Sequence, residues 1–183
     1  MLAIHFCSDP AESVAVLEEL LCEVRARVAA GDGVLESEAV RVFWVNPVAD
    51  LRVMNLLEDA GGRIGGTEYL FCHALDPIPE DLEPMEALAR MALADPMVGS
   101  PVDRAERICL DVRRFGAEAV VISRIPGASH CGLEGLVIGD ILRNRLGIPV
   151  TEIEVPPITD SMEPSLRTRL EAVVEIAIEN RRR

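Results

Sequence analysis

The stretch 40-VRVFWVNPVADLRVMNLLEDAGG-62 decides the fold. Its first residues, as far as Val45, are nearly all β-branched or aromatic, which is typical of a buried strand. The residues that follow Ala49 have the apolar spacing of a helix, and Gly61 and Gly62 end that helix. A strand followed by a helix that glycines terminate is the building unit of a parallel sheet covered by helices.

The same unit repeats towards the C-terminus. Further strands are predicted near residues 63–69, at "EAVVIS" (118–123) and at "PVTEIEV" (149–155), and further helices at 85–94, 101–115, 133–147 and 164–183. The pattern predicts an α/β fold in three layers, with roughly four parallel strands between helices. Ligands bind such sheets beyond the carboxyl ends of the strands, so the candidate loops are 46–50, 123–132 and 156–164.

A separate amphipathic helix is predicted between Asp9 and Gly31. Asp9 suits its N-cap and Pro10 its first position. Its apolar residues recur at spacings of three and four and form one stripe: Val14, Leu17, Leu21, Val24 and Val28. Residues 1–38 are therefore assigned to an N-terminal helical arm and residues 39–183 to the α/β domain. The stripe either packs on its own domain or docks on another subunit or domain.

Composition limits the classes of partner. The formal net charge of -13 argues against binding to nucleic acid or to an anionic membrane, since both need basic surface. All 18 basic residues are arginine. The sequence has neither an apolar run of about 18 residues nor the pattern of a signal peptide, so we expect a cytoplasmic protein without a membrane span.

The cysteines are poorly arranged for disulfides. Their number is odd, and no C-x-x-C pair occurs among Cys7, Cys22, Cys72, Cys109 and Cys131. Cys131 stands just ahead of a predicted helix, where backbone N–H groups and the helix dipole favour a thiolate that ligates metal or attacks an electrophile. The alternative is a small apolar plug in a turn. Cys22 and Cys109 lie on predicted helices and are interpreted as core residues.

Several polar residues surround Cys131 in the sequence. The candidate neighbours of a site there are Arg124, Ser129, His130 and Glu134. Glu134 falls in the first turn of the predicted helix, where capping explains an acid without any chemistry. A nucleophilic Cys131 with His130 or His73 as its base is a third interpretation.

Two other motifs have ordinary interpretations. "GGRIGG" (61–66) matches no phosphate-binding loop and is predicted to lead into a strand. Arg167 and Arg169 lie near the positive end of the last predicted helix, so they either pair with acids or contact a ligand.

The order of several short motifs resembles the 2-hydroxyacyl-CoA dehydratase and benzoyl-CoA reductase family, in the C-terminal half of its catalytic subunits. The motifs include "EDAGGRI" (58–64), "EPMEALAR" (83–90), "EAVVIS" (118–123), "LGIPVTEIE" (146–154) and "LRTRLEAVVE" (166–175). The resemblance covers nearly the whole chain, and the order and spacing of the motifs are more specific than any one of them.

The resemblance implies a flavodoxin-like, Rossmann-like α/β domain in a subunit that pairs with a related subunit. Each subunit would hold an iron-sulfur cluster through three cysteines. It also implies an ATP-dependent activase that delivers one electron at low potential. That electron drives loss of water from a 2-hydroxyacyl-CoA or reduction of an aromatic acyl-CoA.

Cys131 matches one cluster cysteine of this family. The other cluster cysteines belong to an N-terminal domain outside this sequence, and one thiolate cannot hold a [4Fe-4S] cluster. We therefore expect part of an oligomeric lyase complex that is inactive alone and shares its cluster with an N-terminal-domain chain or a paired dehydratase subunit. The alternative is a cluster-free α/β assembly or binding module.

Overall fold

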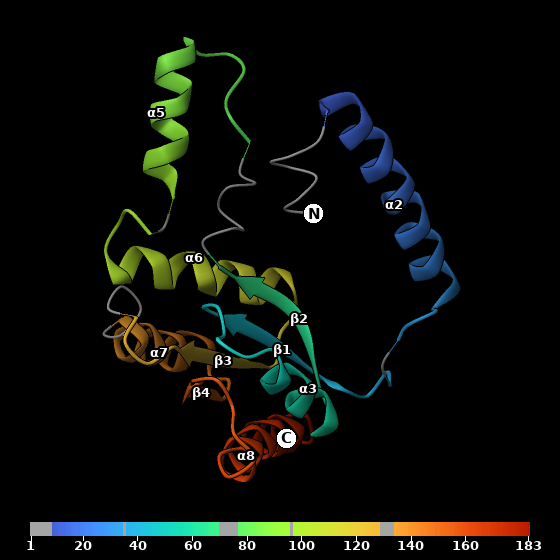
Figure 1. Cartoon of the computed structure of the whole chain (residues 1–183), viewed down its shortest axis with the longest axis vertical. Helices are drawn as coiled ribbons and strands as arrows, with labels where there is room; N and C mark the ends of the chain where they lie inside the picture. Colours follow the sequence, from blue (N-terminus) through green and yellow to red (C-terminus); the bar gives the residue numbers. More distant parts are fainter. Residues whose placement is uncertain (1–8, 35, 70–76, 96, 129–133) are drawn as a thin grey trace. The chain divides into compact units, whose positions relative to one another are not determined.

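The computed structural model describes residues 9–34, 36–69, 77–95, 97–128 and 134–183. The chain divides into two compact units, Met1–Glu38 and Ala39–Arg183 (Figure 1). In the first unit, the described residues form helix α2 (Pro10–Ala30). None of the helices in the described part of the chain has the length and apolar character that a membrane crossing requires.

The second unit alternates strands and helices. In chain order they are β1 (Val40–Val45), α3 (Arg52–Asp59), β2 (Gly62–Glu68), α5 (Pro84–Ala94), α6 (Pro101–Arg114), β3 (Ala119–Arg124), α7 (Glu134–Leu146), β4 (Val150–Glu154) and α8 (Glu163–Arg181). The strand that was predicted near residues 63–69 is thus β2, and it begins one residue earlier, at Gly62.

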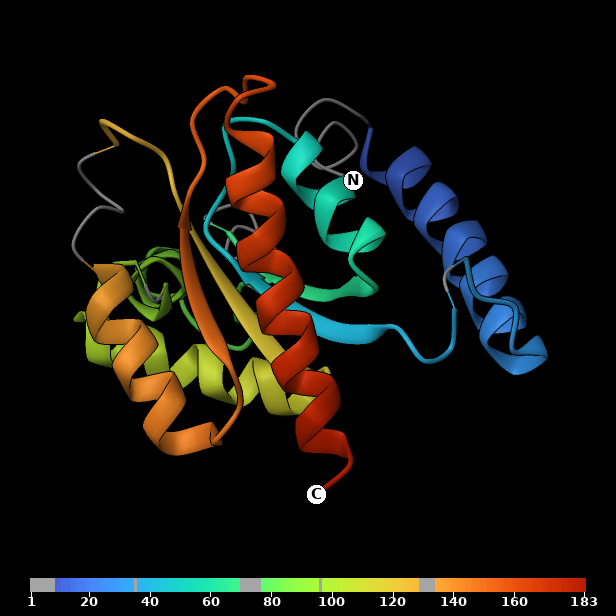
Figure 2. The ribbon, with the colours of Figure 1, turned by 90° about the horizontal axis from the view of Figure 1, so that it is seen from below.

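The strands form one parallel sheet in the order β2-β1-β3-β4. Figure 2 shows α8 and α3 on one face of the sheet and α6 and α7 on the other. This arrangement confirms the predicted α/β fold, a three-layer architecture of the flavodoxin or Rossmann type.

Side chains alternate along the strands and fill two cores. In β1, Val40, Val42 and Trp44 pack in the core against α3 and α8. Phe43 and Val45 point to the opposite core, which α6 and α7 cover. Because both faces of β1 are buried, its sequence is almost continuously apolar, as expected for a central parallel strand.

One local expectation needs correction. Cys109 is buried as expected, but Cys22 is exposed on α2. Val102 lies outside the buried face of α6 and is 44% exposed. Helix α8 begins where the sequence indicated, and its N-cap residue Met162 makes no side-chain capping bond.

Most of the "GGRIGG" motif lies within β2 itself, where it was predicted to lead into a strand. A bulge between Val42 and Phe43 shifts the register of β1 against β2 at this point. A Cβ atom on Gly66 would lie 2.9 Å from ring atoms of both Phe43 and Phe115. The backbone of β2 can therefore approach these rings only with glycine at position 66.

We expect Gly66→Ala to lower the free energy of unfolding by about 1–3 kcal/mol, because the added methyl group overpacks the two rings. Urea denaturation would measure the loss. Gly65→Ala is the matched control, since its Cβ would only contact the Arg41 side chain at an ordinary 3.7 Å. If the Gly66→Ala variant is as stable as this control, the rings of Phe43 and Phe115 can move to accommodate the methyl group without a cost in stability.

Candidate functional site

The strand order creates a topological switch point between β1 and β3. After β1 the chain turns to β2 on one side, and it later returns to β3 on the other. The loops after β1 and β3 therefore leave the sheet in opposite directions, which is where open α/β sheets bind ligands. Val45 is the last residue of β1 and Arg124 the last of β3, so Asn46 and the connection after Arg124 border this point.

Arg104 of α6 joins three elements at this edge of the sheet. Its Nε donates to Glu68 Oε1 at 3.0 Å, and its Nη2 donates to Glu68 Oε2 at 2.7 Å and to Asn46 Oδ1 at 2.6 Å. Its Nη1 donates to Glu134 Oε2 at 2.7 Å. We call these four residues the Arg104 cluster. The cluster links the end of β2, the residue after β1 and the start of α7.

The Arg104 cluster is a buried charge network. The side chains of Arg104 and Glu68 are each 2% exposed, and that of Glu134 is 30% exposed. Burial acts to lower the pKa of Arg104, but the hydrogen bonds and charges of Glu68 and then Glu134 outweigh it, so the pKa is raised. The guanidinium therefore stays charged and fixed between the two carboxylates.

Asn46 and Ser123 fasten the two strand ends to each other. Asn46 has a positive φ of 71°, in the left-handed region that asparagine tolerates better than most residues. Its Nδ2 donates to the Ser123 carbonyl oxygen at 3.0 Å. The Ser123 Oγ accepts from Trp44 Nε1 at 3.0 Å and lies within 3.1 Å of the Val45 carbonyl oxygen. The end of β1 is therefore held by side chains that are themselves buried.

A second side-chain link ties the loop after β1 to the loop after β4. The Asp50 carboxylate accepts from the backbone N–H groups of Arg52 and Ile158, each at 3.0 Å. Arg52 Nη2 donates to Asp50 at 2.8 Å and also to the Ile158 carbonyl oxygen. Hydrogen bonds from the Arg52 side chain, followed by those from the two backbone groups, hold the pKa of Asp50 well below its usual value. Asp50 thus binds the backbone N–H group of Ile158, and Arg52 binds its carbonyl oxygen.

Comparison with known families identifies the chain. The family model described as 2-hydroxyglutaryl-CoA dehydratase, D-component, matches residues 1–177. The chain belongs to this family. The suspected family resemblance is thereby confirmed, and the description implies a dehydratase system that has further components. A search of the curated proteins found no match.

In this member of the dehydratase family, the predicted site residues are only partly described. Cys131, Ser129 and His130 lie outside the described residues, as does His73. Glu134 is the first residue of α7, and it belongs to the Arg104 cluster, a contact that the capping interpretation missed.

Arg124, the remaining predicted neighbour, ends β3 and pairs with the edge strand. Its Nη2 donates to Glu154 Oε2 at 2.8 Å, and its side chain is 39% exposed. It is accessible to a ligand at the carboxyl edge of the sheet.

The described residues do not supply the ligand set of an iron-sulfur cluster. Among them, no group of three or more His, Cys, Asp or Glu side chains could hold a metal ion. Cys109 lies on the buried face of α6, where desolvation raises the pKa of its thiol and disfavours a thiolate. Cys22 lies on α2 in the first unit. The other three cysteines, Cys7, Cys72 and Cys131, lie outside the described residues.

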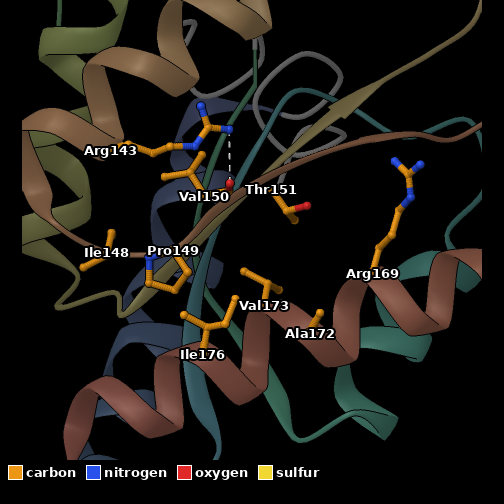
Figure 3. A pocket seen from close by; sticks show the side chains of 9 residues that line it. All are labelled: Arg143, Ile148, Pro149, Val150, Thr151, Arg169, Ala172, Val173 and Ile176. Carbon is orange, nitrogen blue, oxygen red and sulfur yellow. Dashed lines mark hydrogen bonds between the residues drawn. The ribbon is translucent and has the colours of Figure 1, made fainter. Parts of the chain in front are cut away.

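Two grooves follow the edge strand β4. Figure 3 shows the first, of about 370 Å³, between β4 and α8, with Ala172, Val173 and Ile176 along the helix side. The second, of about 320 Å³, continues at the start of α8, and Arg169 lines both. Arg167, in contrast, pairs with Glu163 at 3.2 Å and with Asp59 at 3.6 Å. The ion-pair interpretation therefore holds for Arg167, whereas Arg169 borders open space.

Sequence reasoning missed Arg104, Glu68 and Asn46. A signal for Arg104 was present, since it lies four residues before the buried Ile108 and so falls on the buried face of α6. A charged residue at such a position requires a buried partner. Asn46 follows the buried strand β1, and Glu68 is the last residue of β2. The ends of parallel strands are where such sheets carry their functional polar groups.

Proposed function

We propose that this chain is a subunit of a 2-hydroxyacyl-CoA dehydratase-type complex and contributes Cys131 as one ligand of a shared [4Fe-4S] cluster. The family match over residues 1–177 is the observation that carries the proposal. Such a cluster takes about four ligands, mostly cysteines, so a partner chain supplies the others. A cluster held there would supply one-electron transfer between an ATP-dependent activase and an acyl-CoA substrate. The complex would act in the cytoplasm.

The role of this chain's own residues is to hold the connection that carries Cys131. That connection runs from β3 to α7, and Cys131 precedes Glu134 by three residues in the sequence. At its start, the Ser123 carbonyl group accepts from Asn46. At its end, Glu134 accepts from Arg104, which also binds Asn46. The Arg104 cluster, together with Ser123, therefore fixes both ends of this connection. It supports the segment that carries Cys131 as a rigid frame would.

The accessible arginine at the same edge fits an anionic substrate. The chain as a whole carries a net charge of -13, which repels the phosphates of an acyl-CoA. Arg124 is partly exposed beyond the end of β3 and offers a guanidinium for phosphate or carboxylate contacts. We propose it as the local contact that offsets this repulsion.

The decisive experiment measures iron and acid-labile sulfide per chain after anaerobic purification. The protein would be produced with and without a co-expressed candidate partner that carries the missing cysteines. We expect iron only when the partner is present, and we expect Cys131→Ser to abolish it. Cys22→Ser is the matched control, because Cys22 is exposed on α2 and should not affect the iron content.

Each outcome separates the candidate functions. If the Cys131→Ser variant still contains iron, Cys131 is not a ligand of the cluster, although the chain can still belong to the complex. A colourless, air-stable protein under every condition would contradict the proposal and favour the cluster-free assembly module. The observation that favours this second candidate is the long exposed apolar face of α2, which suits a protein contact.

A further inference from the structure

Helix α2 is well capped but has no buried residue. The Asp9 carboxylate accepts from the N–H groups of Ala11 at 2.8 Å and Glu12 at 3.3 Å. Gly31 ends the helix in the left-handed conformation, with a φ of 68°. None of the 21 residues in between is buried. Because amphipathic helices draw most of their stability from packing, a helix of this kind is expected to have a partner.

Five of the seven large apolar residues exposed on α2 have the spacing of a coiled-coil seam. They follow each other at intervals of three, four, three and four, which is the a and d pattern of a heptad repeat. Their exposed fractions are 55% for Val14, 37% for Leu17, 46% for Leu21, 48% for Val24 and 76% for Val28. In this heptad, Glu18 and Arg25 both occupy e positions beside the seam, and Leu20 and Arg27 both occupy g positions.

We propose that α2 pairs in an antiparallel direction with α2 of a second copy of this chain. The charges of the helix are complementary in this arrangement, because acids dominate its first half and the basic residues Arg25 and Arg27 lie in its second half. Antiparallel coiled coils bring e positions beside e positions. With Leu21 opposite Val24 of the second copy, Glu18 lies beside Arg25 of that copy, and two-fold symmetry forms the pair twice.

The g positions support the same register. There Leu20 meets Arg27 of the second copy, whose aliphatic stem can cover it.

The same charges disfavour the other arrangements. An antiparallel register shifted by one heptad sets Leu17 opposite Leu21 and brings Glu18 beside Glu18 of the second copy, which is repulsive. A parallel pair brings g positions beside e positions, so Leu20 meets Arg25 and Ser13 meets Glu18, and no opposite charges meet within Pro10–Ala30. The overlap is short, which places the dimer among weak, concentration-dependent associations.

Sedimentation velocity of the full chain, between about 1 and 500 µM, tests the proposal. We expect a shift from monomer towards dimer as the concentration rises. Glu18→Arg and Arg25→Glu each replace two attractive contacts by two repulsive ones, so each should weaken the dimer about tenfold. The double variant Glu18→Arg with Arg25→Glu restores complementary pairs and should dimerise like the wild type.

Glu19→Arg is the matched control. It makes the same charge change as Glu18→Arg on a residue one position further from the seam, so it should leave the dimer nearly unchanged. Circular dichroism would confirm that every variant keeps its helix. A monomer at all concentrations, equal effects of the changes at Glu18 and Glu19, or no recovery in the double variant would each overturn the proposal. Cys131→Ser should not alter the dimer. The result of this test is therefore independent of the iron measurement that tests the proposed iron-sulfur cluster.

Discussion

Arg104→Met is expected to lower the free energy of unfolding by about 3–5 kcal/mol, because it removes the guanidinium that neutralises a buried carboxylate. Glu68 is 2% exposed and accepts two hydrogen bonds from Arg104. Methionine fills a similar space but cannot donate to Glu68, Asn46 or Glu134. Urea denaturation followed by the fluorescence of Trp44, the single tryptophan, would measure the loss.

Arg107→Met on the same helix is the matched control. Its Nε lies 3.4 Å from Asp111, and its side chain is 40% exposed, so its removal should cost less than about 1 kcal/mol. Replacing the buried pair together, by Arg104→Met with Glu68→Leu, should recover much of the lost stability, since the buried carboxylate is then removed with its partner and the remaining Glu134 is 30% exposed to solvent. Equal losses for Arg104→Met and Arg107→Met would show that the Arg104 cluster contributes little.

Glu118→Gln is expected to remove part of the protein's resistance to acid. Glu118 lies at the amino edge of the sheet, where its Oε2 accepts from Arg181 Nη2 at 2.6 Å and from the Arg41 backbone N–H at 2.9 Å. Hydrogen bonds from Arg181, with a smaller contribution from Arg41, lower the pKa of Glu118 from its usual 4.5 to about 2. A shift of this size corresponds to at most about 3 kcal/mol of stability.

The sign follows from the lowered pKa. The folded state binds the proton of Glu118 less readily than the unfolded state, so this stability is present above pH 4.5 and is lost as the pH falls towards 2. The difference in unfolding free energy between wild type and Glu118→Gln should therefore be large at neutral pH and should shrink in acid. Glu106→Gln, which breaks a half-exposed pair with Arg145, serves as control and should change stability little. A difference that stays constant with pH would contradict the assignment.

The fold could be predicted from sequence because its signals are local and agree with one another. The near-continuous apolar run of β1 follows from burial on both faces, and glycines mark the ends of α3 and α7. Strand β2 was harder to explain from sequence, because its Gly66 reflects packing against Phe43 and Phe115 from distant parts of the chain. No local pattern reports such a contact.

The candidate site was less predictable, since its chemistry depends on side chains that meet only after folding. Glu68 and Arg104 are brought together by the packing of α6 on the sheet. In the sequence, a buried arginine looks like an ordinary surface residue unless its position relative to the apolar face of the helix is considered. Cys22 shows the converse error, because its apolar surroundings in the sequence suggested burial, whereas the helix that carries it is exposed.

The hydrogen bonds from Asp50 and Arg52 to the backbone of Ile158 connect two loops that follow strands which are not neighbours in the sheet. Strand β3 separates β1 from β4, yet these hydrogen bonds join the loop after β1 directly to the loop after β4. These hydrogen bonds therefore fix the loop at the switch point to the segment that leads into α8, which begins at Glu163. In that segment Ser161 and Met162 line the same groove as Arg169, so the two loops and one wall of the groove share a single set of hydrogen bonds.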